Sequence, residues 1–448
     1  MNWNPPRLHT ARLFLIRNRW LAICLALVIL FGGGALLGWQ VSLREPAVTY
    51  QTPQEKDLYV RFDMEVYDKV LTNFWMKPDE LKLHELFRLS AEKVASTSMT
   101  LATTDRAGTA KMLEDAFKIA TSTDHKRQMA LSIAAVVLYN LPPTGRDGLL
   151  SKSEEVALRE NVSNIDTSKD LYQDLGLEKG ATVAEVAVAS KKKMETLQRA
   201  MSTESKAELA KVAYAESVLT DVNSKALYDQ SGIEPTVFHR VIGTTLYFHI
   251  EKISPTTLRE FGIAVDTAST TPGLESMILD VRGNIGGSLD FLPHFFGLFV
   301  GGNQYTFDLF HQGEYTVERT QQEKFDQLAR YKDIAIITDS MTQSTAELMA
   351  STFKKFNRAH VVGGTTRGWG TVENTYPLET TLDPTTSYSL LLVNSITLRE
   401  DNQPIEGRGV DPDIDTSKPG WEKKLPVYFK SSSLISVIRQ VALKPPLK

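Results

Sequence analysis

The feature that most constrains the fold is the alternation of short apolar runs with helical patterns after residue 236. The runs TTLYFHIEKI, LESMILDVRG and YKDIAIITDS have the length of strands, whereas SPTTLREFGIAVD and STAELMASTFKKFN carry helical periodicity. Strands that alternate with helices form a sheet covered by helices. The sequence therefore predicts an α/β domain with a central sheet for this half of the chain.

The residues before this half carry a different pattern. From residue 58 to about 160, apolar side chains recur at intervals of three and four residues, which predicts helices. The turn-rich stretch NLPPTGRDG interrupts this pattern, and helical periodicity resumes from about 167 to 230. At 448 residues the chain is too long for one ordinary core, so we expect two or three domains.

An uncharged apolar run extends from Trp20 to Trp39. It would span about 30 Å, the thickness of the hydrocarbon core of a bilayer. More arginines precede it than follow it, which predicts a cytoplasmic N-terminus and a main domain outside the cell membrane, periplasmic or on the surface. A cleaved signal peptide is the alternative, although GWQVSLREPA offers no clear cleavage site. We therefore expect a single-pass membrane anchor over residues 20–39.

Composition excludes several classes of function. A net charge of −4, with no dense basic block beyond the N-terminus, gives no reason to expect nucleic acid as a partner. The single cysteine, Cys24, excludes a disulfide framework and a cysteine-based zinc site. The eight histidines show no HExxH or similar ligand spacing, so we expect neither a metal nor another cofactor.

One serine lies where a strand pattern changes to a helix pattern. In IAIITDSMTQSTAELMAS, apolar strand residues and a polar turn precede a helix that holds Ser344 near its start. A hydroxyl at that place would lie near free backbone N–H groups and the positive end of the helix dipole, which favour negative charge. A helix N-cap with Glu347 as the partner of a capping box is the structural alternative for this serine.

Residues 167–232 resemble a J-domain. The resemblance rests on KDLYQDLGLEKG at the opening and on AYAESVLTDVNSKALYDQSG at the end. That family activates DnaK-type chaperones through a His-Pro-Asp tripeptide, and the corresponding stretch LQRAMSTESKAEL has none. We therefore expect a helical hairpin that serves packing or substrate contact, with a chaperone-stimulating role as the alternative.

The segment 236–420 resembles the C-terminal processing (tail-specific) serine peptidases. Four motifs occur in that family's order: MILDVRGNIGGSLDFL, IITDSMTQSTAELMAS, VVGGTTRGWGTVEN and EGRGVDPDI. The resemblance implies a peptidase core of the ClpP/crotonase-like type and hydrolysis of peptide bonds in a polypeptide substrate. In that family a PDZ domain occupies the place of the J-like insert. Because this chain has no PDZ-like segment there, the resemblance does not extend to the recognition of substrate C-termini.

The resemblance also implies the residues of the site. It places the nucleophile on Ser344, and the oxyanion hole on the backbone of Thr345 with that of Gly286 or Gly287. Glycine permits the close backbone approach that such a loop needs. A serine hydroxyl is a poor nucleophile at neutral pH, so it also needs a base beside it.

The expected base is missing. The family's lysine corresponds to Trp369, whose indole has no basic nitrogen, and residues 361–374 contain no lysine. The loop VVLYNLPPTGRDGLLSKSEE also lacks the histidine that some relatives use. The remaining substitutes are His249, His294 and Glu373, and a carboxylate base would need a pKa raised by burial. Two functions stay open: a serine peptidase of impaired activity, and a pseudopeptidase that binds peptides or a partner protein without cutting.

The predicted fold class is α+β or α/β, with a transmembrane helix, a helical region, a J-like helical insert and an α/β peptidase core. The expected segments are the cytoplasmic N-terminus (1–19), the transmembrane helix (20–39), a linker (40–57), the helical N-terminal part of the peptidase-like region (58–160), the J-domain-like insert (167–232), the peptidase-like core (236–420) and a C-terminal segment (421–448). No oligomeric state follows from these patterns.

Overall fold

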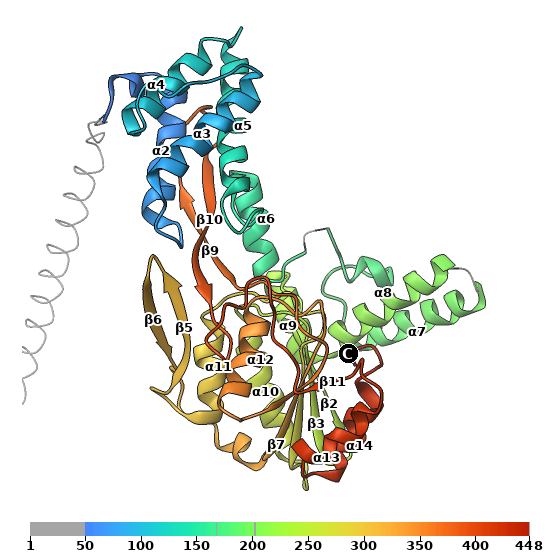
Figure 1. The fold of residues 1–448 in the computed structure, drawn as a ribbon. Helices are drawn as coiled ribbons and strands as arrows, with labels where there is room; N and C mark the ends of the chain where they lie inside the picture. Colours follow the sequence, from blue (N-terminus) through green and yellow to red (C-terminus); the bar gives the residue numbers. More distant parts are fainter. Residues whose placement is uncertain (1–49, 167, 201–202, 448) are drawn as a thin grey trace, which may run out of the picture. The chain divides into compact units, whose positions relative to one another are not determined.

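The computed structural model describes residues 50–166, 168–200 and 203–447. The chain divides into two units, Met1–Lys56 and Asp57–Lys448. The described part of the first unit contains one short 3-10 helix, η1 (Pro53–Lys56). The second unit contains all the other helices and strands of the described chain, and Figure 1 shows how they are arranged.

The predicted fold class requires one correction, in its transmembrane helix. Among the residues that the structure describes, no helix is long and apolar enough to cross a membrane. The helices of 18 residues, α5 (Thr123–Asn140), α7 (Val183–Ala200) and α8 (Thr203–Thr220), all carry charged side chains. The predicted span, residues 20–39, lies outside the described residues. The fold class of the described chain is therefore a mixed α/β core with helical parts.

A six-stranded sheet forms the centre of the second unit. Its strand order is β11-β8-β7-β4-β3-β2, and β3, β4, β7, β8 and β11 run parallel. The strands are β2 (Val237–Ile242), β3 (Thr245–Ile250), β4 (Ser276–Asp280), β7 (Asp333–Thr338), β8 (His360–Gly363) and β11 (Ile414–Asp415). Every residue of β3 and of β4 is buried, as expected for strands covered on both faces.

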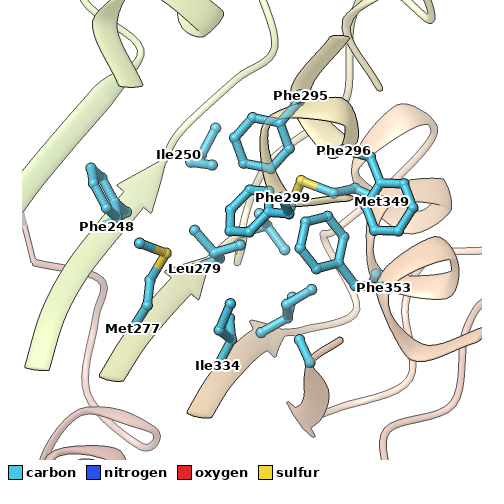
Figure 2. Close-up of a cluster of buried hydrophobic side chains, with 14 of the residues drawn as sticks. Phe248, Ile250, Met277, Leu279, Phe295, Phe296, Phe299, Ile334, Met349 and Phe353 are labelled. Atoms are coloured by element: carbon cyan, nitrogen blue, oxygen red, sulfur yellow. The ribbon is translucent and has the colours of Figure 1, made fainter. Parts of the chain in front are cut away.

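Helices cover both faces of this sheet. Alternate residues of β3, β4 and β7 face α10 (Thr257–Ser269), α11 (Phe291–Val300) and α12 (Thr345–Lys355) on one side. Figure 2 shows the phenylalanines of α11 and α12 packed over strand residues such as Leu279. The C-terminal helices α13 (Leu425–Tyr428) and α14 (Ser432–Val441) cover the opposite side, after η4 (Trp421–Lys424).

A second, antiparallel sheet lies beside the first, and the sequence analysis does not predict it. Its strands are β1 (Gly148–Ser151), β5 (Tyr305–His311), β6 (Glu314–Arg319), β9 (Thr371–Pro377) and β10 (Tyr388–Thr397). Strand β10 pairs with β1, β5 and β9, and in Figure 1 it extends with β9 alongside α2 and α6. The apolar run YSLLLVNSITL has the pattern of a strand, and in the structure it forms β10 of this second sheet.

The N-terminal helices pack on β10. They are α2 (Leu58–Asn73), α3 (Glu80–Ala95), α4 (Arg106–Phe117) and α5, followed after β1 by α6 (Lys152–Val162). The side chains of Asp57, Asp79, Asp105 and Ser122 accept backbone N–H groups at the starts of α2 to α5. Strand β10 contributes Leu390, Leu392 and Val393 to the same apolar core as these helices.

The insert has a small core of its own. It contains η2 (Gln173–Leu175), α7, α8 and α9 (Val222–Ser231). The residues behind the J-domain resemblance, including Tyr172, Leu175, Val218 and Leu219, are buried in that core. They therefore serve the packing of the helices against one another.

The apolar layer between the sheet and α12 yields a stability prediction. Phe353 is fully buried, with ring centroids of Phe296 and Phe299 both at 5.0 Å. Because Phe353→Ala would leave a cavity, we expect the free energy of unfolding to fall by about 3–5 kcal/mol, measured by urea denaturation. Phe356→Ala, at a side chain that is 40% exposed, is the matched control and should cost much less. Equal losses from the two variants would contradict this packing.

Candidate functional site

Ser344 lies at the turn between β7 and α12. Its backbone has φ 56° and ψ −129°, a conformation that residues other than glycine rarely adopt. The turn is held by the Asp339 carboxylate, whose Oδ1 accepts the N–H groups of Gly283, Met341 and Thr342 at 2.9–3.0 Å. Such a conformation costs on the order of 1–3 kcal/mol and persists only where surrounding contacts hold it.

A buried carboxylate ties this turn to the next loop. Glu347, in the first turn of α12, is fully buried and accepts the backbone N–H of Ser344 at 2.8 Å. It also accepts the Thr366 hydroxyl at 2.5 Å and the N–H groups of Gly368 and Trp369 at 2.6 and 2.8 Å. Burial raises the pKa of Glu347, and these hydrogen bonds oppose that rise. One side chain thus fixes the serine relative to the loop that follows β8.

Two glycines face the serine. A Cβ on Gly286 (φ 85°) would lie 2.7 Å from the Cβ of Ser344, and a Cβ on Gly287 would lie 1.7 Å from the carbonyl oxygen of Ile253. Both positions therefore require glycine, for close approach as well as for backbone conformation. The structure brings the Gly286–Gly287 turn and Ser344 together in one part of the fold.

Two backbone N–H groups beside Ser344 make no hydrogen bond within the described chain. The Gly286 N–H donates to the Asn284 side chain at 2.8 Å and is already engaged. Within the described chain, the N–H groups of Gly287 and Thr345 have no hydrogen-bond acceptor. The Thr345 hydroxyl donates to the carbonyl oxygen of Gly287 at 2.8 Å and so fixes one segment against the other. Of the two glycines that the sequence leaves open, Gly287 is the one with a free donor.

These residues line one groove of about 740 Å³. Ser344, Trp369 and Glu373 all contribute to its wall, and so do both glycines and Thr345. Apolar side chains from α6, α12, the loop before α11 and the second sheet also line it, namely Leu158, Leu348, Leu289, Leu309 and Leu391. The size and the mixed lining are those of a site for an organic ligand or a peptide segment.

Trp369 is held at its face and at its edge. The Arg146 guanidinium carbon lies 3.5 Å from the centroid of the indole, a stacking distance, and this arginine pairs with Glu406 at 2.8 Å. The indole Nε1–H donates to Glu373 Oε1 at 3.1 Å. Sequence reasoning does not predict the Arg146 contact, because the arginine comes from the loop after α5, far away in the chain.

Of the three residues predicted as possible substitutes for the lysine, Glu373 is the one that lines the groove. Burial raises its pKa, while hydrogen bonds from Thr371 and Trp369 lower it, and the net shift is upward. His249 contacts the carbonyl oxygen of Asp280 at 3.2 Å, His294 accepts a hydrogen bond from Gln322 at 3.1 Å, and neither lines the groove. The structure thus separates both histidines from the serine.

No base is bonded to the serine in this structure. Over residues 50–166, 168–200 and 203–447, no lysine, histidine or carboxylate side chain makes a hydrogen bond with the Ser344 hydroxyl. One lysine lies in the wall of the groove, Lys252, which the sequence analysis does not single out. Its ammonium donates to Asn161 Oδ1 at 2.6 Å, and burial lowers its pKa. Its place directly after the buried strand β3 is the sequence signal that could identify it.

Solved structures with a similar course of the chain include a lipoprotein from Streptococcus agalactiae and the photosystem II D1 C-terminal processing protease. The first has a TM-score of 0.41 and 15% identity, covering 86% of this chain and 98% of that one. The second has a TM-score of 0.44 and 12% identity, covering 80% of this chain and 92% of that one.

Two curated relatives carry the name "Probable CtpA-like serine protease". That of Staphylococcus saprophyticus is 27% identical over 176 residues, which is 39% of this chain and 34% of the relative. That of Staphylococcus aureus (strain bovine RF122) is 24% identical over 347 residues, 71% of this chain and 67% of the relative. The chain thus matches about a third of the length of the first relative.

A family model matches the part of the chain that contains the groove. The model "Peptidase family S41" matches residues 244–416, which include both glycines, Ser344 and the Trp369 loop. Its match agrees with the names of the curated relatives. Residues 244–416 of this chain thus match peptidase family S41, and the similar curated proteins are named as CtpA-like serine proteases.

Proposed function

We propose that this chain is a serine-type peptidase that cleaves peptide bonds of a polypeptide held in the groove at Ser344. The observation that carries the proposal is the arrangement of one strained serine against two unengaged backbone donors, those of Gly287 and Thr345. Ser344 is also the N-cap of α12, in a capping box with Glu347, so the strained backbone and the two unengaged N–H groups are what support a catalytic role in addition to capping.

In this proposal the Ser344 oxygen attacks the carbonyl carbon of the scissile bond. The hydroxyl proton passes to Glu373, and the carbonyl oxygen, now negatively charged, accepts hydrogen bonds from Gly287 and Thr345. Each such donor lowers the barrier by about 3 kcal/mol. Glu373 then returns the proton to the leaving amine, and a water molecule hydrolyses the acyl-enzyme by the same path in reverse.

We expect hydrolysis to be slow. A carboxylate with a raised pKa accepts a proton less readily than a desolvated lysine, because catalysis by a base improves as its pKa approaches the operating pH. Two hydrogen bonds also occupy Oε1 of Glu373, and because they stabilise the ionised carboxylate they lower its affinity for a proton.

A second function, favoured by the clamped tryptophan, is peptide binding without hydrolysis. The Trp369 ring stacks on the Arg146 guanidinium and donates to Glu373, and the serine hydroxyl has no base bonded to it within the described residues. In this case the groove would still take an extended polypeptide, and the two backbone donors would bind one of its carbonyl groups.

A fluorophosphonate probe separates the two functions. Because it reacts only with an activated serine, we expect covalent labelling of the full-length chain and complete loss of label in Ser344→Ala. In-gel fluorescence and mass spectrometry of the labelled peptide provide the measurement. An unlabelled wild-type chain that still binds unfolded polypeptide would support the second function and contradict the first.

Restoring the family's pattern of residues should increase the rate. In the double variant Trp369→Lys, Glu373→Gln, the lysine would lie beside the Arg146 cation, which lowers an ammonium pKa and frees the amine as a base. We expect hydrolysis of fluorescently labelled casein to rise by about 10²-fold or more, the usual contribution of a positioned base.

The matched control for this gain is Trp369→Leu, Glu373→Gln, which removes the same indole and carboxylate but adds no basic nitrogen. It should hydrolyse casein no faster than the wild-type chain. If both double variants behave alike, Trp369 does not occupy the place of a base, and the proposed arrangement of the site is wrong.

A further inference from the structure

A second carboxyl group lies behind the wall of the groove. Asp147, just before β1, is 7% exposed, and its Oδ1 accepts the backbone N–H of Val393 at 2.6 Å. Its other oxygen, Oδ2, is buried and has no hydrogen-bond partner in the part of the chain that the structure describes. An ionised carboxyl group in such a place costs free energy, so the group tends to keep its proton or to share one with a neighbour.

The neighbour is Glu373. Val393, the residue whose N–H binds Asp147, is also the register partner of Glu373 in the pairing of β10 with β9. Asp147 and Glu373 are therefore both neighbours of one residue of β10, through a hydrogen bond and through strand pairing respectively. Asp147 is buried and Glu373 half-buried, and burial raises the pKa of each carboxyl group.

The other charges nearby are already paired with each other. Arg146 stacks on Trp369 and pairs with Glu406, whose second oxygen accepts the Gly370 N–H at 2.8 Å. Strand β10 carries no charged side chain between Tyr388 and Thr397. Glu373 is thus the charged group that acts on Asp147, whereas Arg146 favours the ionised form of Glu373.

The two groups cannot both ionise at low cost. Burial raises the pKa of Asp147 to about 7, the Val393 N–H opposes this rise, and the negative charge of Glu373 adds to it. Two side-chain donors and the Arg146 cation favour the ionised form of Glu373, whereas Oδ2 of Asp147 has no donor in the described chain. A proton shared by the pair is therefore expected on Asp147.

We propose that Asp147 and Glu373 form a coupled carboxyl pair that holds one proton near neutral pH, and that Asp147, acting through this pair, sets the basicity of Glu373. The inference rests on the proposed function, in which Glu373 accepts the Ser344 proton. When Asp147 loses its own proton, its charge increases the proton affinity of Glu373 and makes it the stronger base. Asp147 is therefore a positioning residue that does not touch the substrate.

The pH dependence of thermal stability tests the pair without any need for hydrolysis. The pKa of Asp147 is raised above the value of about 3.9 for an unfolded chain, so its contribution to stability is full below that pH and is lost as pH rises through about 7. Asp147→Asn keeps an acceptor for the Val393 N–H but cannot ionise. We expect the melting temperature of Asp147→Asn minus that of the wild-type chain to be larger at pH 8.5 than at pH 5, by at least about 2 °C.

The same comparison in a Glu373→Gln background measures the coupling. With no charge at position 373, the gain from Asp147→Asn between pH 5 and pH 8.5 should shrink but not vanish, because burial is the larger cause of the raised pKa of Asp147. Asp326→Asn, at an exposed aspartate, is the control and should change little with pH in either background. A gain that is independent of pH, or equal in both backgrounds, would overturn the carboxyl pair.

The rate of casein hydrolysis provides the second readout. In the wild-type chain it should increase in a step near pH 7, as Asp147 ionises, and Asp147→Asn should lose this step while retaining the activity measured at pH 6. A step that persists in Asp147→Asn would overturn the effect of Asp147 on Glu373. If coupling is present in the melting temperatures but no variant hydrolyses casein, the carboxyl pair stands and the peptidase function fails.

Discussion

The geometry of the groove depends on the buried carboxylate of Glu347. Four donors converge on it, one from the serine turn and three from the loop that contains Trp369. A charge in the interior is tolerated only where hydrogen bonds replace its hydration, and these four provide that replacement. Because the same oxygens bind the backbones of Ser344 and Trp369, the position of one residue fixes that of the other.

The parallel sheet explains why these segments meet. The carboxyl ends of β3, β4, β7 and β8 lie at one edge, and the loops that leave them carry Lys252, the glycine turn, Ser344 and Trp369 in that order. Gly286 and Gly287 allow backbone to approach the serine and Ile253 more closely than any side chain would permit. The second sheet then adds Glu373 from β9 and forms the remaining wall of the groove.

Much of this site could be predicted from local patterns. The strand-turn-helix signal places Ser344 at a helix start, and the order of the four motifs brings it to the Gly286–Gly287 turn. The choice between the two glycines could not be predicted, because it depends on the Asn284 side chain engaging one N–H. A sequence shows which residues are present but not which donors are already occupied.

The surroundings of the missing lysine were beyond prediction for a different reason. Arg146 and Asp147 follow α5 in a turn-rich loop with no recognisable motif, and only tertiary packing brings them to Trp369 and Val393. Burial, which raises the pKa of Glu373, is likewise a property of the assembled sheet. The same limit applies to β10, whose apolar pattern identifies a strand but not the sheet to which it belongs.

The central claim is that Ser344 attacks a carbonyl carbon whose oxygen binds Gly287 and Thr345. The most direct measurement is a crystal structure of the chain after incubation with a peptide aldehyde. We predict a tetrahedral adduct on the Ser344 oxygen, with the former aldehyde oxygen about 2.7–3.1 Å from both backbone nitrogens. A peptide bound without a covalent bond, or an adduct whose oxygen faces away from the two nitrogens, would contradict the claim.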